Sequence, residues 1–569
     1  MSALNRLNRS LLGILFPKGE NIRTCRTRLK IIRSFSLFLF ALVIIRLADL
    51  TLLQPSQEEV IHNASLHIEG HFERADIVDR NGVLLATTLQ VPSLFADPTL
   101  IDNKPYIANQ LEQILGISNV LPKLEREGRF VWIKRGITPD QHYKVNALGS
   151  PGLAFRTETR RLYPQGKNAA HLVGYTSVDG AGLSGIELKY DDYLKQSDNP
   201  LTLAVDVRLQ YALAKALNKQ MQDFNAKGAA GGVIDIETGE IIAAVSLPDF
   251  DPHHAGKADN AALFNRFALG VYEMGSTFKL FSTAAYVEET GHAFSQKFDA
   301  REPLEEGRFT INDFHAEKRI LTLPEVFIHS SNIGSALMGR AIGDEGMQKF
   351  YSDLGFMDRV EADFPALGKP LTPNPWREIN TLTASYGHGI AVSPLHVLQA
   401  TAAIVNGGVK PNLTFAKRNT VNNDIQRRII SASTAYKMKQ LLRLNVTNGS
   451  GQKADINGYM VGGKTGTSEK IVNGEYSKDK LMSSFIGVFP IHQPKYAVLA
   501  ILDEPKGTKE SFGYATGGWT AAPVVGDVIA DIVRIEGFVP DLGAPNMTAG
   551  LDRYLKQEDP LFSPVNFRR

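Results

Sequence analysis

Ser276 and Lys279 are the two side chains whose types and spacing best suit nucleophilic chemistry. They open the run STFKLFSTAAYVEET, whose pattern predicts a helix that ends before Gly291. A spacing of three residues places the Ser276 hydroxyl and the Lys279 amine on one helix face. A serine hydroxyl needs a neighbour that takes its proton, and a lysine does so when burial and a nearby cation lower its pKa. We therefore predict that Ser276 is a nucleophile and Lys279 its general base.

The S-x-x-K pattern alone is common, because it also describes an ordinary helix cap followed by a surface lysine. The chain holds a second copy, from Ser477 to Lys480, inside the polar stretch NGEYSKDK. No apolar periodicity surrounds that copy, so we expect it to be a solvated loop.

Ser330 and Asn332 form a second polar motif, between the runs VFIH and IGSALMG, where two helices are expected to meet. Its hydroxyl and amide would relay protons and hold a substrate carbonyl. The alternative is a polar turn or cap, and a second S-x-N at Ser197 and Asn199 shows how common the pattern is.

A third motif, Lys464-Thr465-Gly466-Thr467, follows GYMVGG and precedes the strand-like run SSFIGVFP. Glycines at 462, 463 and 466 would let another backbone lie close to this strand. A substrate could add as an extra strand, with the Lys464, Thr465 and Thr467 side chains binding its carboxylate. The alternative is a glycine-rich hairpin without chemical function.

The composition describes a folded chain that is large enough to position such motifs. It has 569 residues, of which 43% are hydrophobic, and this length corresponds to roughly three or four domain equivalents. A single Cys excludes an intrachain disulfide and a cysteine-cluster metal site. His253 and His254 lie in a turn without a third ligand, and no Walker-type phosphate loop is found, so we expect no metal and no cofactor.

The N-terminal segment predicts a membrane anchor. Residues 1–33 contain eight Lys or Arg and one acid, Glu20, and form a basic cytoplasmic tail. Residues 34–53, SFSLFLFALVIIRLADLTLL, are long enough for one transmembrane helix. Arg46 and Asp49 lie one turn apart near its far end, where they would pair with each other, extend toward the lipid headgroups or contact a partner helix. A cleaved signal peptide is the main alternative, but no small-x-small cleavage site follows Ile45. The body from residue 55 onward would then be periplasmic, and we expect no nucleic-acid partner.

The exported body is expected to have an α/β (α+β) fold in two parts. Residues 55–200 read as short strands and turns, with a hairpin centred on Asn81-Gly82, and form a pedestal. Residues 201–545 form a catalytic domain that starts with a strand and an amphipathic helix (201–222) and a hairpin (229–248). Residues 546–569 are polar and read as a C-terminal tail.

Taken together, the motifs resemble those of one known family. Ser276, Ser330 and Lys464 follow one another at separations of 54 and 134 residues, the order found in penicillin-recognising serine acyltransferases. YEMGSTFK (272–279), RRLYPQGKNAAHLVGY (160–175) and YGHGIAVSPLHVLQATAAIVNGG (386–408) resemble class B penicillin-binding proteins of the FtsI-type, division-specific branch. The chain departs from the family at Met274, where Pro is common, at Ala75, where Gly is usual, and at Gly462, where Ala is usual.

The resemblance implies a single N-terminal transmembrane helix, an elongated non-catalytic pedestal of dimerisation type and a transpeptidase domain. That domain would have a central antiparallel sheet flanked by helices, plus a helical subdomain. The protein would lie in the bacterial inner membrane at the division septum. Its partners would be peptidoglycan stem peptides, β-lactam antibiotics, a SEDS-family glycosyltransferase and other divisome membrane proteins.

The resemblance also implies a role for each motif residue. Ser276 would attack a D-Ala-D-Ala bond, release D-Ala and pass the acyl group to a neighbouring stem amine. The Ser276 and Thr467 N–H groups would form the oxyanion hole. The residues assigned to catalysis are Ser276, Lys279, Ser330 and Asn332, and those assigned to substrate binding are Lys464, Thr465, Gly466 and Thr467.

Three alternatives stay open. An elongation-specific class B transpeptidase would share the site, although that branch usually lacks the Glu-x-Gly-Ser-Thr-Phe sequence found here around Ser276. A β-lactamase or D,D-carboxypeptidase would pass the acyl group to water, but no E-x-x-L-N lies between Ser330 and Lys464. A non-catalytic divisome scaffold would not need the intact motif series.

Overall fold

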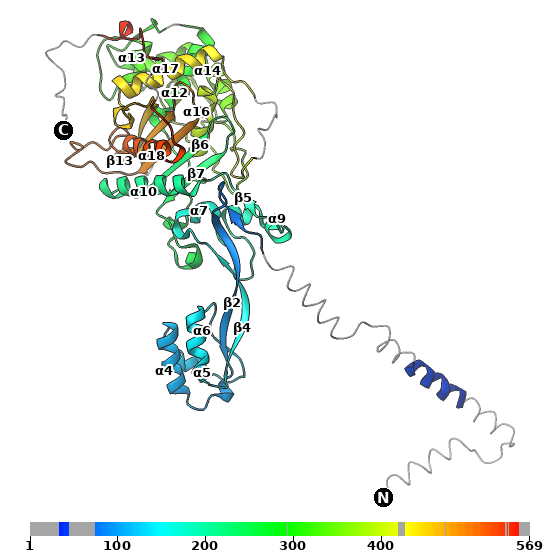
Figure 1. Ribbon diagram of the computed structural model, residues 1–569. Helices are drawn as coiled ribbons and strands as arrows, with labels where there is room; N and C mark the ends of the chain where they lie inside the picture. Colours follow the sequence, from blue (N-terminus) through cyan, green and yellow to red (C-terminus); the bar gives the residue numbers. More distant parts are fainter. Residues whose placement is uncertain are drawn as a thin grey trace, which may run out of the picture. The chain divides into compact units, whose positions relative to one another are not determined.

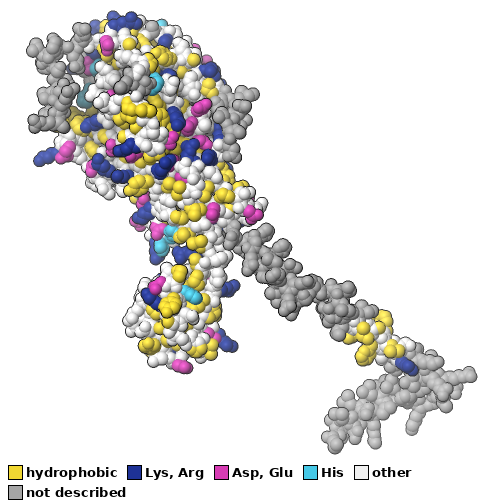
Figure 2. Space-filling model, in the orientation of Figure 1, with side chains coloured by type: hydrophobic (Ala, Val, Ile, Leu, Met, Phe, Trp, Pro, Cys, Tyr) yellow, Lys and Arg dark blue, Asp and Glu magenta, His cyan; other side chains and the backbone are white. Residues whose placement is uncertain are grey.

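The computed structural model describes residues 33–44 and 74–556, the latter with gaps at 293, 419–426, 473, 541–542 and 544. The chain divides into two compact units, residues 1–73 and 74–569. In the first, residues 33–44 form a helix whose apolar side chains, such as Phe38 and Phe40, are exposed (Figure 2). The predicted transmembrane segment is thus described only as far as residue 44. Within the described ranges, no helix combines the length and the apolarity needed to cross a membrane.

The second unit begins with a small twisted sheet (Figure 1). Strand β1 (Ile77–Val78) forms a hairpin with β2 (Leu84–Ala96), as predicted from Asn81-Gly82. The turn closes because Asp79 Oδ1 accepts hydrogen bonds from the N–H groups of Asn81 and Val83. β2 also pairs with β3 (Val131–Lys134) and with β4 (Leu153–Leu162), and β5 (Leu201–Thr202) runs parallel to β1.

Three helices pack at one end of β2 and β4 (Figure 1): α4 (Lys104–Leu115), α5 (Leu121–Leu124) and α6 (Pro139–Asn146). Their buried residues, among them Leu111 and Leu124, form a separate small core with Leu94 and Ile133 of the strands. This core is local, so it stabilises the end of the strands without involving the three sequence motifs.

A buried charge network lies at the other end of the same strands. Glu187, on α8 (Gly185–Lys189), binds two arginines: Arg74 Nε lies 2.5 Å from its Oε2 and Arg161 Nε lies 2.8 Å from its Oε1. Arg74 also binds Asp191, at the start of α9 (Asp191–Gln196), at 2.6 Å. All three members of the central triad are almost fully buried. Sequence analysis did not identify this network, because its members are far apart in the chain.

The part of the chain that holds the three motifs is built on a five-stranded antiparallel sheet with the order β12-β13-β14-β6-β7. β6 and β7 form the predicted hairpin of residues 229–248. The strands are β6 (Gly228–Asp235), β7 (Ile241–Leu247), β12 (Gly462–Val472), β13 (Glu475–Phe489) and β14 (Tyr496–Asp503). The sheet therefore joins an early hairpin to three late strands, which completes the central antiparallel sheet that was expected.

Helices cover both faces of this sheet (Figure 1). On one face, α10 (Val207–Asp223) and α18 (Ala521–Glu536) pack together, with Leu213 and Ile529 in the same core as Phe485. On the other face, α12 (Lys279–Thr290) and α16 (Pro394–Val405) share a core with Ile486. Phe485 and Ile486 are adjacent in β13. Successive side chains of a strand point to opposite faces of the sheet, so these two residues belong to the two different cores.

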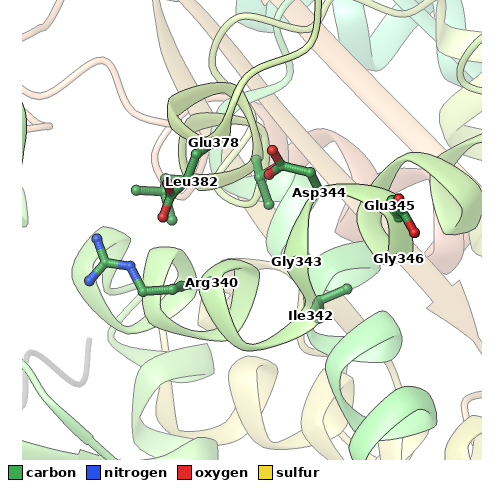
Figure 3. Close-up of a pocket in the computed structure, with 9 residues that line it drawn as sticks. Arg340, Ile342, Gly343, Asp344, Glu345, Gly346, Glu378 and Leu382 are labelled. Atoms are coloured by element: carbon green, nitrogen blue, oxygen red, sulfur yellow. The ribbon is translucent and has the colours of Figure 1, made fainter.

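Four further helices lie between the early hairpin and the late strands: α13 (Leu323–Ile328), α14 (Asn332–Leu354), α15 (Glu378–Ala384) and α17 (Ala432–Asn448). Phe327 and Leu354 belong to the same core as Ile486 of β13. α14 is kinked at Gly343, whose φ of +77° is left-handed. A cavity of about 420 Å³ opens at this kink, next to Asp344, Glu345 and Glu378 (Figure 3).

The C-terminal segment corrects one prediction. Residues 546–556 are not a free tail, because Met547 and Leu551 are buried. The Thr322 hydroxyl donates to the Tyr554 carbonyl at 2.7 Å, and the Lys556 N–H donates to Glu325 at 2.8 Å. Two isolated apolar residues give no periodic signal, so sequence reasoning could not detect this packing. Residues 557–569 lie outside the described residues.

Candidate active site

Ser276 lies in a one-turn 3₁₀ helix, η5 (Gly275–Phe278), which leads directly into α12. The helix that was predicted to end before Gly291 does end at Thr290. Gly275 has a φ of +52°, and a Cβ at this position would lie 2.3 Å from the Thr467 carbonyl oxygen. The nucleophile turn is therefore held tightly against β12, and only glycine fits before Ser276.

Lys279 is fully buried, and its Nζ reaches three of the predicted site residues. It lies 3.0 Å from Ser276 Oγ, 3.2 Å from Ser330 Oγ and 2.8 Å from Asn332 Oδ1. It also donates to the Ser330 carbonyl. Burial lowers the pKa of Lys279 well below its usual value, the nearby Lys464 lowers it further, and Asp313 opposes the shift. A neutral amine next to Ser276 Oγ can take the serine proton.

Ser330 and Asn332 lie where α13 ends and α14 begins, as predicted. Ser330 has a φ of +57°, a left-handed conformation that is costly for a residue with a Cβ. This conformation lets both its hydroxyl and its carbonyl face Lys279.

The loop before the short strand β11 (Ile320–Thr322) fixes this motif, and sequence analysis missed it. Asp313 accepts a hydrogen bond from Ser331 Oγ at 2.7 Å and another from the Ile333 N–H at 3.0 Å. The Asn312 carbonyl accepts from Asn332 Nδ2 at 2.9 Å, which leaves Asn332 Oδ1 to face Lys279. Nothing in the local pattern around Asp313 signals this contact, because its partners come about twenty residues later.

Lys464, Thr465, Gly466 and Thr467 lie on β12, which is an edge strand of the sheet. Lys464 is fully buried, its Nζ lies 3.1 Å from Ser330 Oγ, and burial lowers its pKa to about 7. Thr465 Oγ1 is bound by Ser450 at 2.5 Å, and Thr467 Oγ1 accepts from the Gly517 N–H at 3.1 Å.

Gly466 shows why this strand needs a glycine. A Cβ there would lie 2.3 Å from the Met274 carbonyl oxygen and 2.3 Å from Thr277 Oγ1. The prediction that another backbone lies close to β12 is therefore confirmed, but the backbone is the protein's own nucleophile turn. At Gly462 and Gly463 the nearest contacts include side chains, of Ile491 and Phe485 respectively.

The structure thus brings the three motifs into one cluster centred on Ser330. The second S-x-x-K and the second S-x-N of the chain lie outside this cluster. Ser477 and Lys480 lie in β13, so the predicted loop is wrong: the strand begins at Glu475 and extends the hairpin beyond its buried part. Ser197 and Asn199 form a local exposed turn in which Ser197 Oγ contacts the Asn199 backbone.

The arrangement suits acyl transfer. It combines a serine next to a buried amine, a hydroxyl that connects two lysines, and an edge strand with lysine and threonine side chains. Such a site can deprotonate the serine, stabilise an acyl intermediate and bind a carboxylate.

Comparison with known proteins agrees with this chemistry. A family model of the penicillin binding protein transpeptidase domain matches residues 229–530, and one of the penicillin-binding protein dimerisation domain matches residues 71–221. The probable peptidoglycan D,D-transpeptidase FtsI of Caulobacter vibrioides is 39% identical over 481 residues, which cover 82% of this chain and 81% of the relative. The probable peptidoglycan D,D-transpeptidase PenA of Neisseria gonorrhoeae is 30% identical over 573 residues, covering 92% and 96%.

Solved structures share the fold. Penicillin binding protein 3 of Mycobacterium tuberculosis, complexed with aztreonam, aligns with a TM-score of 0.66 at 22% identity, over 83% of this chain and 98% of that one. A peptidoglycan synthetase from Bifidobacterium adolescentis aligns with a TM-score of 0.66 at 20% identity, covering 84% and 98%.

The chain therefore belongs to the penicillin-binding protein transpeptidase family. Within that family it is a class B penicillin-binding protein, and its activity is that of a serine-type D-Ala-D-Ala peptidoglycan transpeptidase.

Proposed function

We propose that this protein is an FtsI-type transpeptidase that cross-links septal peptidoglycan during cell division. The observation that carries the site assignment is the buried Lys279 amine 3.0 Å from Ser276 Oγ. The division role is supported by the FtsI name of the relatives from Caulobacter vibrioides and Escherichia coli.

In the proposed acylation step, Ser276 Oγ attacks the carbonyl carbon of the penultimate D-Ala, and Lys279 Nζ takes the hydroxyl proton. The Ser276 and Thr467 N–H groups stabilise the oxyanion. The bond to the terminal D-Ala breaks, and its nitrogen receives a proton through Ser330, so D-Ala leaves as a neutral amine. Before this step, Lys464, Thr465 and Thr467 bind the terminal carboxylate along the β12 edge. Gly466 lets the nucleophile turn lie against the same strand.

In the second step, an amine from a neighbouring stem attacks the acyl-enzyme carbonyl. The amine loses a proton to Lys279, the ester bond to Ser276 breaks, and Ser276 Oγ regains a proton. Asn332 holds the substrate amide while Ser330 passes protons between Lys279 and Lys464. β-Lactams follow the first step as substrate mimics and leave Ser276 acylated.

The test is the intact mass of the protein after treatment with benzylpenicillin. One stable adduct is expected on the unaltered chain and on Ser477→Ala, which changes the other S-x-x-K serine, and none on Ser276→Ala. Rapid drug hydrolysis without a lasting adduct would instead indicate a β-lactamase or carboxypeptidase. Neither an adduct nor hydrolysis would favour a non-catalytic scaffold.

The cellular role has a separate test. Depletion of a septal enzyme produces filaments, because elongation continues while division stops. Rounded cells would contradict the division role and support the elongation-specific alternative.

We further propose that residues 34–53 anchor the protein in the inner membrane, with residues 1–33 cytoplasmic and the rest periplasmic. The basic flank and the uncharged first twelve residues of the segment support this placement. The pedestal is proposed at 55–200 and the transpeptidase domain at 201–545, close to the two family-model matches. A chain that begins at residue 55 should leave the membrane fraction, and its retention there would contradict the anchor.

The anchor also provides a contact for membrane partners. We propose that Arg46 and Asp49 contact a SEDS-family glycosyltransferase or another divisome membrane protein, because polar residues in a membrane span favour contacts between helices. Replacing both with Leu should abolish co-purification with that partner while acylation by benzylpenicillin is unchanged.

A further inference from the structure

Glu273, three residues before Ser276, contacts two segments that border the nucleophile turn. Its Oε1 accepts a hydrogen bond from the Gly389 N–H at 3.0 Å. The Tyr476 hydroxyl lies 3.2 Å from each of its two carboxylate oxygens. Its backbone carbonyl accepts from Ser468 Oγ of β12 at 2.5 Å. One residue thus joins the nucleophile turn to two other parts of the chain.

The first of these parts is the far end of the β12–β13 hairpin. Tyr476 pairs with Ile471 there, beyond a bulge between Glu469 and Lys470. Lys470 holds the hairpin up to this bulge through ion pairs with β14 and the residue after it. Past the bulge, Tyr476 and Ile471 are exposed, so the core provides little restraint there and the contacts of Tyr476 with Glu273 and with the His388 ring matter more. The contact with Glu273 is therefore well placed to hold the end of the strand that carries Lys464 and Thr467.

The second part is the turn formed by residues 386–389. A Cβ on Gly387 would lie 2.1 Å from the Gly275 carbonyl oxygen, so this turn lies directly against the nucleophile turn. The His388 ring lies between Tyr386 and Tyr476, with centroid distances of 5.2 and 5.5 Å. Burial and the nearby Lys279 lower the pKa of His388 to about 4, so the turn brings no positive charge toward Lys279 at neutral pH.

We propose that Glu273 is a positioning residue that fixes the gap between the β12 edge and Ser276. Its carboxylate holds the 386–389 turn and the end of the hairpin against the nucleophile turn, so that a carboxylate bound by Lys464 presents its carbonyl at the right distance from Ser276 Oγ. Glu273 acts through Gly389 and Tyr476 and has no direct role in proton transfer. This inference rests on the proposed function of Ser276 and adds a residue that the three motifs do not contain.

The experiment measures acylation of the full chain by a fluorescent penicillin, with the binding constant and the first-order acylation rate determined separately. Glu273→Ala should lower the acylation rate by about 10- to 100-fold, since small misplacements of reacting groups cost about this much. Glu273→Gln keeps an acceptor for both donors and should stay within about threefold of the unaltered chain. Tyr476→Phe removes one of the two contacts and should have an intermediate effect.

Matched controls separate positioning from general damage. Glu475→Ala removes an exposed carboxylate on the same hairpin, and Tyr436→Phe removes an exposed hydroxyl on α17, so both should acylate normally. The double change Glu273→Ala with Tyr476→Phe should be no worse than Glu273→Ala alone, because one contact cannot be lost twice. Additive losses, or a Glu273→Gln variant as slow as Glu273→Ala, would overturn the proposal.

Hydrogen exchange supplies a readout that does not depend on activity. In Glu273→Ala, the Gly389 amide loses its acceptor, so amides of 386–389 and 474–478 should exchange faster while those of α12 stay protected. Unchanged exchange in both segments would contradict the proposal even if acylation slowed. If the unaltered chain formed no penicillin adduct, the function of Ser276 would fail, and the exchange result would still decide whether Glu273 holds the two segments.

Discussion

The side-chain nitrogens of Lys279 and Lys464 both lie within hydrogen-bonding distance of one atom, the hydroxyl oxygen of Ser330, at 3.2 and 3.1 Å. Both lysines are fully buried, and burial lowers the pKa of each. Two ammonium groups on one hydroxyl would repel each other, so the free site favours one charged and one neutral lysine. Ser330 can pass a proton between them. Its strained left-handed conformation is consistent with such a role, because strained residues cluster at functional sites.

This pair predicts a bell-shaped pH dependence for acylation efficiency with benzylpenicillin. Lys279 must be neutral to take the Ser276 proton, so the efficiency should fall as the pH drops below the lowered pKa of Lys279. Lys464 must be charged to bind the drug carboxylate, so the efficiency should also fall as the pH rises above about 7. A bound carboxylate raises the pKa of Lys464, and the alkaline limb of the first-order rate should lie at higher pH.

The Lys464→Arg variant tests the assignment of the two limbs. Arginine stays protonated across the accessible range, so the alkaline limb should disappear while the acid limb remains. An alkaline limb that is unchanged in this variant would assign it to another group. Ser276 acylation measured by mass at each pH is the appropriate readout.

Asp313 is expected to influence both the position of the Ser330–Asn332 motif and the pKa of Lys279. Because its carboxylate raises the pKa of Lys279, Asp313→Asn should move the acid limb to lower pH. The amide also weakens the contacts with Ser331 and Ile333, so we expect stability to fall by about 1 kcal/mol. Asp299→Asn, at an exposed carboxylate paired with Arg301, is the control and should leave the pH profile unchanged. An acid limb that stays in place or moves upward would contradict this role.

Gly466→Ala is expected to abolish acylation. The added methyl would overlap the Met274 carbonyl, Thr277 Oγ1 and Ser484 Oγ, all within 2.4 Å, and the backbone atom among them cannot rotate away. Gly256→Ala is the matched control, because a Cβ there has no atom within 4 Å. A Gly466→Ala protein that binds penicillin at the normal rate would show that β12 can move away from the nucleophile turn.

Glu187→Ala is expected to destabilise the fold by about 3–5 kcal/mol, because it leaves the Arg74 and Arg161 guanidinium groups buried without their shared carboxylate. Thermal unfolding measures the loss. Glu158→Ala breaks the more exposed pair with Arg135 and should cost at most about 1 kcal/mol. Equal effects of the two changes would show that the buried network contributes no special stability.

Much of the fold and of the site could be predicted from local patterns in the sequence. The hairpins at Asn81-Gly82 and at 229–248, and the helix from Lys279 to Thr290, follow from turn residues and periodicity over short windows. The three motifs were recognisable because each is contiguous. The prediction that Ser477 lies in a loop was wrong, because an exposed strand end has the same polar composition as a loop.

What sequence reasoning missed depends on contacts between distant residues. Asp313 meets Ser331, Glu273 meets Tyr476, and Arg74 meets Glu187, and none of these pairs shares a local pattern. The packing of Met547 and Leu551 was missed for the same reason. The contact of Glu273 with Tyr476 depends on the sheet, because the late β12–β13 hairpin lies against the nucleophile turn. The other contacts join loops and helix ends to residues far along the chain, and no local pattern specifies them.

The order of that sheet also has a consequence for the newly made chain. β6 pairs with β14, from Gly228 opposite Asp503 to Asp235 opposite Tyr496. The early strand β6 therefore cannot form this pairing until the late strand β14 has been synthesised. On the ribosome, the interval between residues 276 and 464 lasts on the order of 10–40 s at about 5–20 residues per second. Throughout this time Ser276 has no Lys464 and no β12 edge beside it. We therefore expect a chain whose synthesis has not passed residue 464 to react slowly with penicillin, and its reactivity to appear only once β12 has been made.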